Sequence, residues 1–186
     1  IGGVGLIKDY KKMITMDFKK IDNLVMVIGK TEGHIDQSLF ARTILDEKKG
    51  PPPEVNLFNE KNNGETLLEL IENGLIKSAH DISLGGLIIA VSKMCIKGNK
   101  GIKFKKSENL INEIEYLFSE DQGRYIIEIE PKDLKTVTNI LDKNSVHYEE
   151  LGYIIDNDMI INEKTKVTID ELRTCNTNWL LNYMSN

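Results

Sequence analysis

The alternation of apolar and polar positions predicts helices and strands that interleave along the chain. A continuous apolar run at 24–28 ends at a glycine and indicates a buried strand. The pattern at 85–96 is apolar almost all round, which is typical of a buried helix. We expect 24–28, 87–95 and 126–129 to be the least exposed segments. Further helices are expected at 37–46, 54–73, 112–118, 132–143 and 170–184, and further strands at 76–79, 124–130, 148–155 and 159–169.

Interleaved helices and strands indicate an α/β or α+β class with a layered sheet.

Three local features refine the expected helices, strands and loops. The last two strands, 148–155 and 159–169, are close in sequence and are expected to pair. Asn62, Asn63 and Gly64 are expected to interrupt the long helix. The lysine-rich run 97–106 contains almost no aromatic residues, so we expect a solvated loop there rather than a nucleic-acid contact.

Composition narrows the possible partners. The 186 residues include 24 Lys and Arg against 29 Asp and Glu, a net charge of −5. Nucleic-acid binders usually carry a basic excess, so we expect no nucleic acid as partner. No apolar run reaches the roughly 18 residues of a membrane span, so we expect no membrane either. Cys95 and Cys175 match no zinc or redox spacing and indicate free thiols in a reducing cytoplasm.

The chain opens with an apolar, glycine-rich segment at 1–7, whereas chain termini are usually polar. We interpret residues 1–186 as one domain of a longer protein, with 1–8 leading in from a missing domain. Residues 170–186 would form its C-terminal helix. A trimmed native start is the alternative.

The turn that joins the strand at 76–79 to the buried helix carries the most unusual group of side chains. It contains His80, Asp81, Ser83, Gly85 and Gly86. Free N–H groups at a helix N-terminus suit a phosphate, and paired glycines let a ligand approach the backbone. Asp81 could hold Mg²⁺ together with phosphate oxygens. The alternative is structural: Ser83 caps the helix, Asp81 makes a local turn and His80 is a buried histidine.

Two other turns offer candidate ligand contacts. The loop 29–34 follows a buried strand but lacks the glycine spacing of a P-loop. Thr31 and Ser38, like Gln122 and Arg124 in the next turn, could contact a phosphate or an interface, with a polar surface loop as the alternative. Gln122 and Arg124 lie between a helix and a strand, and the planar guanidinium suits phosphate or carboxylate. A helix-ending turn with solvated charges is the alternative.

Four stretches in fixed order support a family assignment. They are Ile1 to Ile7, Gly29 to Phe40, Ala79 to Leu87 and Phe118 to Tyr125. The last three resemble the patterns G-x-T-x-G-x-L-G-Q-S-L-Y, A-H-D-x-S-D-G-G-L and F-G-E-D-Q-G-R-Y, and the first resembles the segment that leads into the last domain. Together they resemble the C-terminal domain of the synthetase subunit of phosphoribosylformylglycinamidine synthase, in the aminoimidazole ribonucleotide synthetase superfamily.

The resemblance implies an α+β domain with a layered mixed sheet flanked by helices. It implies a cytoplasmic parent ligase that converts formylglycinamide ribonucleotide, ATP and glutamine-derived ammonia into formylglycinamidine ribonucleotide in purine biosynthesis, with Mg²⁺. It also implies three partners: the remaining domains of the same chain, a glutaminase subunit and a small bridging subunit. The catalytic histidine and most ATP ligands lie outside this segment. The isolated chain is therefore expected to contain no catalytic residue and to be inactive.

The resemblance also implies an auxiliary site for ATP or ADP. Asp81 and Ser83 match positions that face a second nucleotide with Mg²⁺ in large single-chain relatives. By this resemblance we expect His80, Ser83, Gly85 and Gly86 to contact the nucleotide and Asp81 to hold Mg²⁺. Three departures reduce the expectation of nucleotide binding: Leu84 replaces an aspartate, and Asp36 and Ser119 replace glycines.

Two other functions stay open. One is another synthetase of the superfamily, acting in aminoimidazole ribonucleotide, thiamine phosphate or selenophosphate chemistry. The stretches at 33–38 and 120–124 argue against it. The other is a scaffold or regulatory domain with a degenerate nucleotide site.

Overall fold

The computed structural model describes residues 2, 4–106 and 111–185. The strands are β1 (Leu24–Ile28), β2 (Ile76–Asp81), β3 (Gly101–Phe104), β4 (Tyr125–Ile129), β5 (Tyr148–Ile155), β6 (Asp158–Ile160) and β7 (Lys166–Thr168). The helices are α1 (Leu39–Thr43), α2 (Leu57–Glu72), α3 (Gly86–Gly98), α4 (Glu113–Phe118), α5 (Leu134–Lys143) and α6 (Ile169–Met184), with 3-10 turns at Tyr10–Lys12 and Pro131–Asp133.

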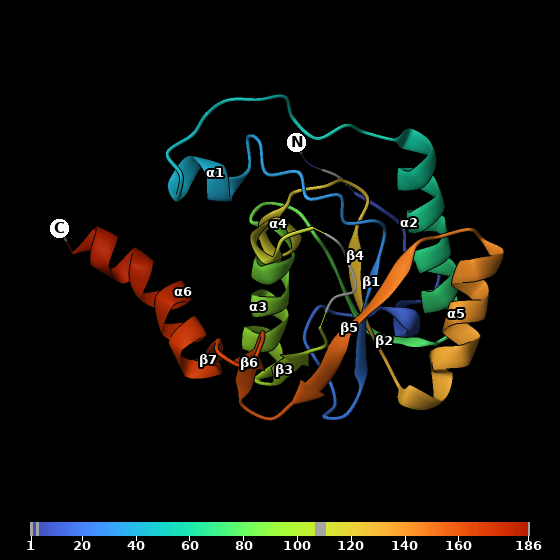
Figure 1. The fold of residues 1–186 in the computed structure, drawn as a ribbon. Coiled ribbons are helices and arrows are strands. Elements are labelled where there is room, and N and C mark those ends of the chain that lie inside the picture. The colour runs from blue at the N-terminus through green and yellow to red at the C-terminus, as the bar shows by residue number, and fades with distance from the viewer. Residues whose placement is uncertain (1, 3, 107–110, 186) are drawn as a thin grey trace.

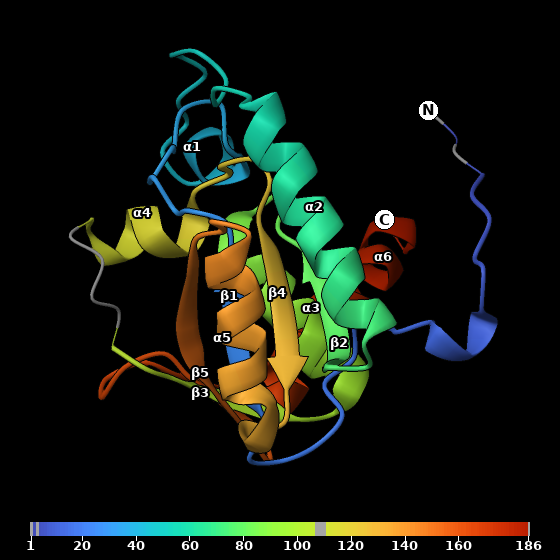
Figure 2. The same cartoon turned by 90° about the vertical axis from the view of Figure 1, so that its right-hand side faces the viewer.

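The strands form one mixed sheet in the order β2-β4-β1-β5-β3-β6-β7. Every neighbouring pair is antiparallel except β3 and β6. Helices α2 and α5 cover one face, and α3 and α4 cover the other (Figures 1 and 2). The predicted α+β class, a layered mixed sheet flanked by helices, is confirmed.

The apolar run of β1 is explained by its place in the middle of the sheet. Successive side chains of a strand point to opposite faces. Val25 and Val27 pack with α3, whereas Met26 and Ile28 pack with α2 and α5. All four side chains are at most 1% exposed. A strand buried on both faces needs apolar residues at every position, which is why no polar residue interrupts this run.

The three segments expected to be least exposed are indeed the interior. Within 87–95 of α3, only Lys93 is exposed and Ile89 is partly covered. In β4 the buried positions include a charged one, Glu128, with no exposed surface. Its carboxylate accepts hydrogen bonds from the Asn23 side chain at 2.7 Å and the Ser78 hydroxyl at 2.8 Å. It also accepts the backbone N–H groups of residues 19 and 20, so this buried charge is fully partnered.

Two expectations about strands are wrong. The segment 159–169 is not one strand paired with β5: it divides into β6, β7 and the start of α6, while β5 pairs with β1 and β3. The lysine-rich run contains β3, in which Ile102 is buried and Lys103 is exposed. A Cβ at Gly101 would lie 2.0 Å from the carbonyl oxygen of Asp158, so this strand packs too closely for a side chain there.

Helix α2 is not interrupted where a break was expected. Asn62 donates to the carbonyl oxygen of Asn144 at 2.8 Å, and Asn63 donates to that of Gly123 at 2.9 Å. These bonds hold the helix against neighbouring turns, which outweighs the low helix propensity of the stretch. Helix α1 is shorter than expected, with five residues.

The two ends of the chain lie away from the sheet. Residues 2 and 4–7 are exposed and form no strand, and α6 extends outward from β7 (Figures 1 and 2). Whether 1–8 leads in from another domain stays a prediction, and residues 1 and 3 lie outside the described residues. Within the described ranges, no helix combines the length and apolar character that crossing a membrane requires.

Candidate functional site

The three motif stretches that the structure describes in full converge at one end of the sheet. Strands β1 and β2 end there and β4 begins there, because β4 runs antiparallel to both. This brings together the loop 29–38, the turn 82–85 and the turn 119–124, at the top of Figure 1. We call this the motif end.

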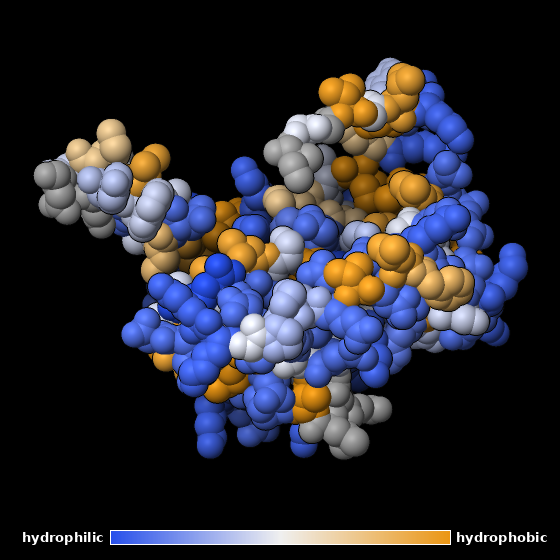
Figure 3. Space-filling model, turned by 90° about the horizontal axis from the view of Figure 1, so that it is seen from above, coloured by the Kyte–Doolittle hydropathy of each residue, from blue (hydrophilic) through white to orange (hydrophobic). Residues whose placement is uncertain are grey.

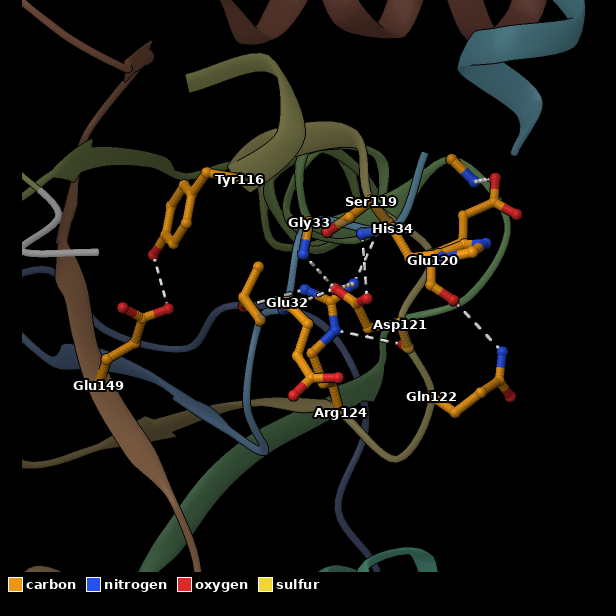
Figure 4. A network of polar contacts seen from close by, with 12 residues as sticks. Glu32, Gly33, His34, Tyr116, Ser119, Glu120, Asp121, Gln122, Arg124 and Glu149 are labelled. Atoms are coloured by element: carbon orange, nitrogen blue, oxygen red, sulfur yellow. Dashed lines mark hydrogen bonds and ion pairs between the residues drawn. The ribbon is translucent and has the colours of Figure 1, made fainter. Parts of the chain in front are cut away.

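Asp121 holds the loop after β1 in place. Its Oδ2 accepts the backbone N–H groups of Glu32 and Gly33 at 3.0 and 3.1 Å. Its Oδ1 accepts the N–H of His34 at 3.1 Å. The carboxylate therefore fills the concave side of three consecutive N–H groups (Figure 4). A bound anion would need such groups, but here the protein's own carboxylate uses them.

Arg124 is the buried centre of the same turn. Its Nη1 donates to the Thr31 hydroxyl at 3.0 Å, and its Nη2 donates to the carbonyl oxygen of Ser119 at 2.7 Å. Its Nε donates to the carbonyl oxygen of Asp121 at 3.2 Å. Burial lowers the pKa of the guanidinium, while the Asp121 carboxylate opposes this effect.

Glu120 joins two helix N-termini. Its Oε1 accepts the N–H of Leu39 at the start of α1, at 2.7 Å, and the N–H of Gly85 before α3, at 2.8 Å. A carboxylate at a helix N-terminus is stabilised by the free N–H groups and the helix dipole. One oxygen therefore fixes α1 and α3 relative to the turn 119–124.

The residues predicted to bind nucleotide lie at the end of β2 and in the turn that follows it. His80 Nδ1 lies 3.1 Å from Asp81 Oδ1, and the His80 Nε2 atom is buried with no hydrogen-bond partner among the described residues. The Asp81 side chain is 62% exposed. Ser83 is exposed, and its carbonyl oxygen accepts the N–H of Gly86. The structural alternative that Ser83 caps α3 is wrong, since Gly85 is the N-cap residue and provides no side chain.

The Glu149 carboxyl group of β5 lies beside these turns. It accepts a hydrogen bond from the Tyr116 hydroxyl at 2.9 Å (Figure 4). Burial raises the pKa of the Glu149 carboxyl, whereas this hydrogen bond lowers it.

Three of the expected contact residues have their polar groups engaged within the chain. Arg124 and Thr31 are 1% and 3% exposed, and Arg124 Nη1 donates to the Thr31 hydroxyl. Ser38 is 1% exposed and caps α1 by accepting the N–H of Ala41 at 3.1 Å. Gln122 stays on the surface, where it donates to the carbonyl oxygen of Glu120 at 3.3 Å.

A metal ion would have few protein ligands here. In the part of the chain that the structure describes, no three His, Cys, Asp or Glu side chains group closely enough to hold one. Asp81 fits only the arrangement in which one carboxylate and phosphate oxygens share the ion.

The sequence analysis missed the roles of Glu120 and Asp121. Both stand in a stretch that it singled out, but it assigned the chemistry to the neighbouring amide and guanidinium. No local signal indicates these roles, because the N–H groups that the two carboxylates accept lie 35 to 89 residues away in the sequence.

Comparison with known proteins agrees with this arrangement. Residues 20–162 match the family described as "AIR synthase related protein, C-terminal domain". The chain belongs to this family. On the structure, the matched residues begin just before β1 and end just after β6.

Full-length relatives of this family member are much longer. The chain is 67% identical over 186 residues to "Phosphoribosylformylglycinamidine synthase subunit PurL" of Pelagibacter ubique, covering 100% of this chain and 26% of the relative. It is 38% identical over 184 residues to the subunit of the same name from Bartonella henselae, covering 99% and 25%. The chain thus spans about a quarter of the curated relatives that it matches.

Solved structures share the fold. Thermotoga maritima PurL complexed with FGAR has a TM-score of 0.74 at 20% identity, over 88% of this chain and 30% of that chain. The same protein complexed with ATP has a TM-score of 0.66 at 19% identity, over 88% and 27%. The structure of PurLQS from Thermotoga maritima has a TM-score of 0.66 at 23% identity, over 88% and 28%.

Proposed function

We propose that this chain is the C-terminal domain of an ATP-dependent ligase that forms formylglycinamidine ribonucleotide from formylglycinamide ribonucleotide and glutamine-derived ammonia. The observation that carries the proposal is the 67% identity to a PurL subunit along the whole chain. The convergence of the motif stretches at one end of the sheet supports it, because residues far apart in sequence then share one surface.

In this function the motif end forms one side of a larger active site. The turns there are held by hydrogen bonds of Asp121, Glu120 and Arg124. This surface therefore keeps its shape without a ligand. The chain supplies no catalytic residue of its own, and the reacting groups belong to the remaining domains. The glutaminase and small bridging subunits would complete a cytoplasmic assembly, in line with the PurLQS complex of the Thermotoga protein.

An auxiliary ATP or ADP would bind at the turn before α3. The exposed Asp81 and Ser83 could contact Mg²⁺ and phosphate. His80 stands beside Asp81, and its Nε2 is buried with no hydrogen-bond partner among the described residues. Gly85 and Gly86 leave the helix N-terminus without side chains.

A second candidate is a scaffold whose nucleotide site has degenerated. Two observations favour it: Glu120 already accepts the N–H of Gly85, and Leu84, at the position of an acid in the family pattern, is 56% exposed. A phosphate would have to compete with a carboxylate, and like charges repel.

Two experiments test these functions. In the first, this chain replaces its counterpart in the Pelagibacter ubique subunit, and formylglycinamidine ribonucleotide formation is followed with ammonium chloride as nitrogen donor. We expect the chimera to be active and the chain alone to be inactive. An inactive chimera that folds and assembles would contradict the ligase function.

The second experiment is calorimetric titration of the isolated chain with Mg·ADP. We expect a dissociation constant on the order of 1 mM or weaker, a binding free energy of about 4 kcal/mol. Micromolar binding that Asp81→Asn abolishes would contradict the scaffold reading.

A further inference from the structure

The chain contains two Asn–Gly steps, Asn63–Gly64 and Asn73–Gly74, one inside α2 and one at its end. In such a step the glycine nitrogen can attack the side-chain carbon Cγ of the asparagine, because glycine has no Cβ that obstructs the approach. The ring that forms is opened by water, and the asparagine becomes aspartate or isoaspartate. Since the reaction needs only water and a base, the structure around each step decides whether it occurs.

The second step lies at the exposed end of α2. Asn73 is the C-cap residue, and Gly74 follows it with a φ of +70°. The Gly74 N–H donates to the carbonyl oxygen of Ile71 at 2.9 Å, and Asn73 Nδ2 donates to that of Glu69 at 2.8 Å. Both Asn73 and Gly74 are exposed, and among the described residues nothing lies within 4 Å of a Cβ added at Gly74. This turn can therefore open without uncovering the core.

The first step is enclosed by the fold. Asn63 is 7% exposed, and its Nδ2 donates to the carbonyl oxygen of Gly123 at 2.9 Å. Gly64 stands in the middle of the 16-residue helix, where its N–H belongs to the helical hydrogen bonds. An attack on Asn63 would have to break the helix in its middle and pull this side chain away from the turn 119–124. Such an opening costs more free energy than the opening of a helix end.

The two ends of α2 differ in their surroundings. The helix begins at the motif end and ends at the opposite end of the sheet, about 24 Å away (Figures 1 and 2). Figure 3 looks onto the motif end, where orange residues lie among blue ones. The step Asn73–Gly74 is therefore separate from the surface that the proposed ligase function uses.

We propose that Asn73–Gly74 is a modification site, at which the folded chain converts asparagine into isoaspartate and aspartate while Asn63–Gly64 stays protected. This inference goes beyond the proposed function and does not depend on it. In the first step the bond from the Gly74 nitrogen to Asn73 Cγ forms, the Cγ–Nδ2 bond breaks, a base takes the Gly74 amide proton, and ammonia leaves. Water then cleaves one of the two ring C–N bonds. Cleavage at Cγ gives aspartate, and cleavage at the main-chain carbonyl gives isoaspartate.

The product changes the charge at this end of α2. A new carboxylate stands at the helix C-terminus, where the helix dipole disfavours a negative charge. Glu69 and Glu72 lie within the preceding turn and add repulsion. Lys12 offsets part of it, since its Nζ donates to the carbonyl oxygen of Glu72 at 2.9 Å. Isoaspartate also lengthens the backbone by one carbon, which disrupts the cap that Gly74 forms.

The test follows both steps in the same sample. The folded chain is kept at mildly alkaline pH, and peptide mapping by mass spectrometry measures the conversion of Asn63 and Asn73 over time. Enzymatic methylation identifies isoaspartate. We expect Asn73 to convert at least about tenfold faster than Asn63. In urea the two should convert at similar rates, because the helix that protects Asn63 is then lost.

The variant Gly74→Ala tests the attacking atom. Its methyl group crowds the nitrogen, so conversion of Asn73 should slow by about tenfold, and circular dichroism verifies that the variant is folded. The proposal is overturned if Asn73 stays unchanged in the folded chain, or if both steps convert equally there. A difference that persists in urea would assign the selectivity to the neighbouring sequence instead of the fold. Unchanged conversion in Gly74→Ala would show that water hydrolyses the side-chain amide directly, without the ring.

Discussion

Replacing Arg124 by lysine tests whether this buried cation holds the motif turns together. Its three nitrogens donate to three separate acceptors, on Thr31, Ser119 and Asp121. Lysine carries its donors on a single nitrogen, so it cannot reach all three. Hydrogen bonds to a charged group contribute about 1.5–3 kcal/mol each. Losing one or two of them while leaving a buried charge poorly paired should reduce the free energy of unfolding by about 3 kcal/mol.

Urea unfolding followed by circular dichroism measures this change, with linear extrapolation to water. Arg173→Lys is the matched control, because Arg173 is on the surface and pairs with Asp170 at 2.7 Å. Surface pairs contribute about 0–1 kcal/mol, so this control should stay close to the wild type. The reasoning is refuted if Arg124→Lys unfolds within about 0.5 kcal/mol of the wild type, since the extrapolation resolves larger differences.

Three other measurements follow from the packing and the pKa values. Gly86→Ala should destabilise the chain by about 3 kcal/mol, because its Cβ would lie 2.6 Å from the carbonyl oxygen of Ser119. In the control Gly74→Ala the added Cβ meets nothing within 4 Å among the described residues, so the loss should be only about 1 kcal/mol. Equal losses of stability in the two variants would contradict this account. Burial raises the pKa of Cys95 to about 12, whereas Cys175 is exposed. A thiol reagent at mildly alkaline pH should therefore label Cys175 alone until urea is added, and labelling of both thiols in the folded chain would disprove the buried position. Burial also raises the pKa of Glu149, so its ionisation destabilises the fold as pH rises above about 4.3, the usual glutamate pKa. Glu149→Gln should therefore gain stability relative to the wild type between acidic and neutral pH, and a difference that does not change with pH would speak against this burial.

The apolar pattern predicted the interior well, because a segment that is buried on both faces requires apolar residues at nearly every position. The run at β1 is continuous, α3 is apolar on most sides, and β4 is interrupted only by Glu128; each lies in the core. The short strands were harder to predict. β3 has four residues, and its one fully buried side chain, Ile102, stands among lysines. Its pairing with β5 and β6 is decided by packing that the local sequence does not encode.

For the candidate site, the sequence predicted the position better than the roles of the residues. Its position was predictable, since the motif stretches follow or precede strands that meet at one end of the sheet. The roles of the charged residues were not. Arg124 was interpreted as a ligand-binding residue by chemical type, and only the fold shows that the Thr31 hydroxyl and two backbone carbonyl groups of the chain itself satisfy it. Residue type gives the chemistry that a side chain can perform, while burial decides which partner it meets.

The central position of β1 has a consequence for how the chain is made. Both strands that flank β1, β4 and β5, lie in the second half of the chain, and Ile28 pairs with Tyr125 and Tyr148. At a synthesis rate of about 5–20 residues per second, β1 leaves the ribosome roughly 5–20 seconds before its first partner. During that interval a fully apolar strand has no sheet to join. The nascent chain therefore offers chaperones, or a neighbouring nascent chain, the same residues that later form the middle of the sheet.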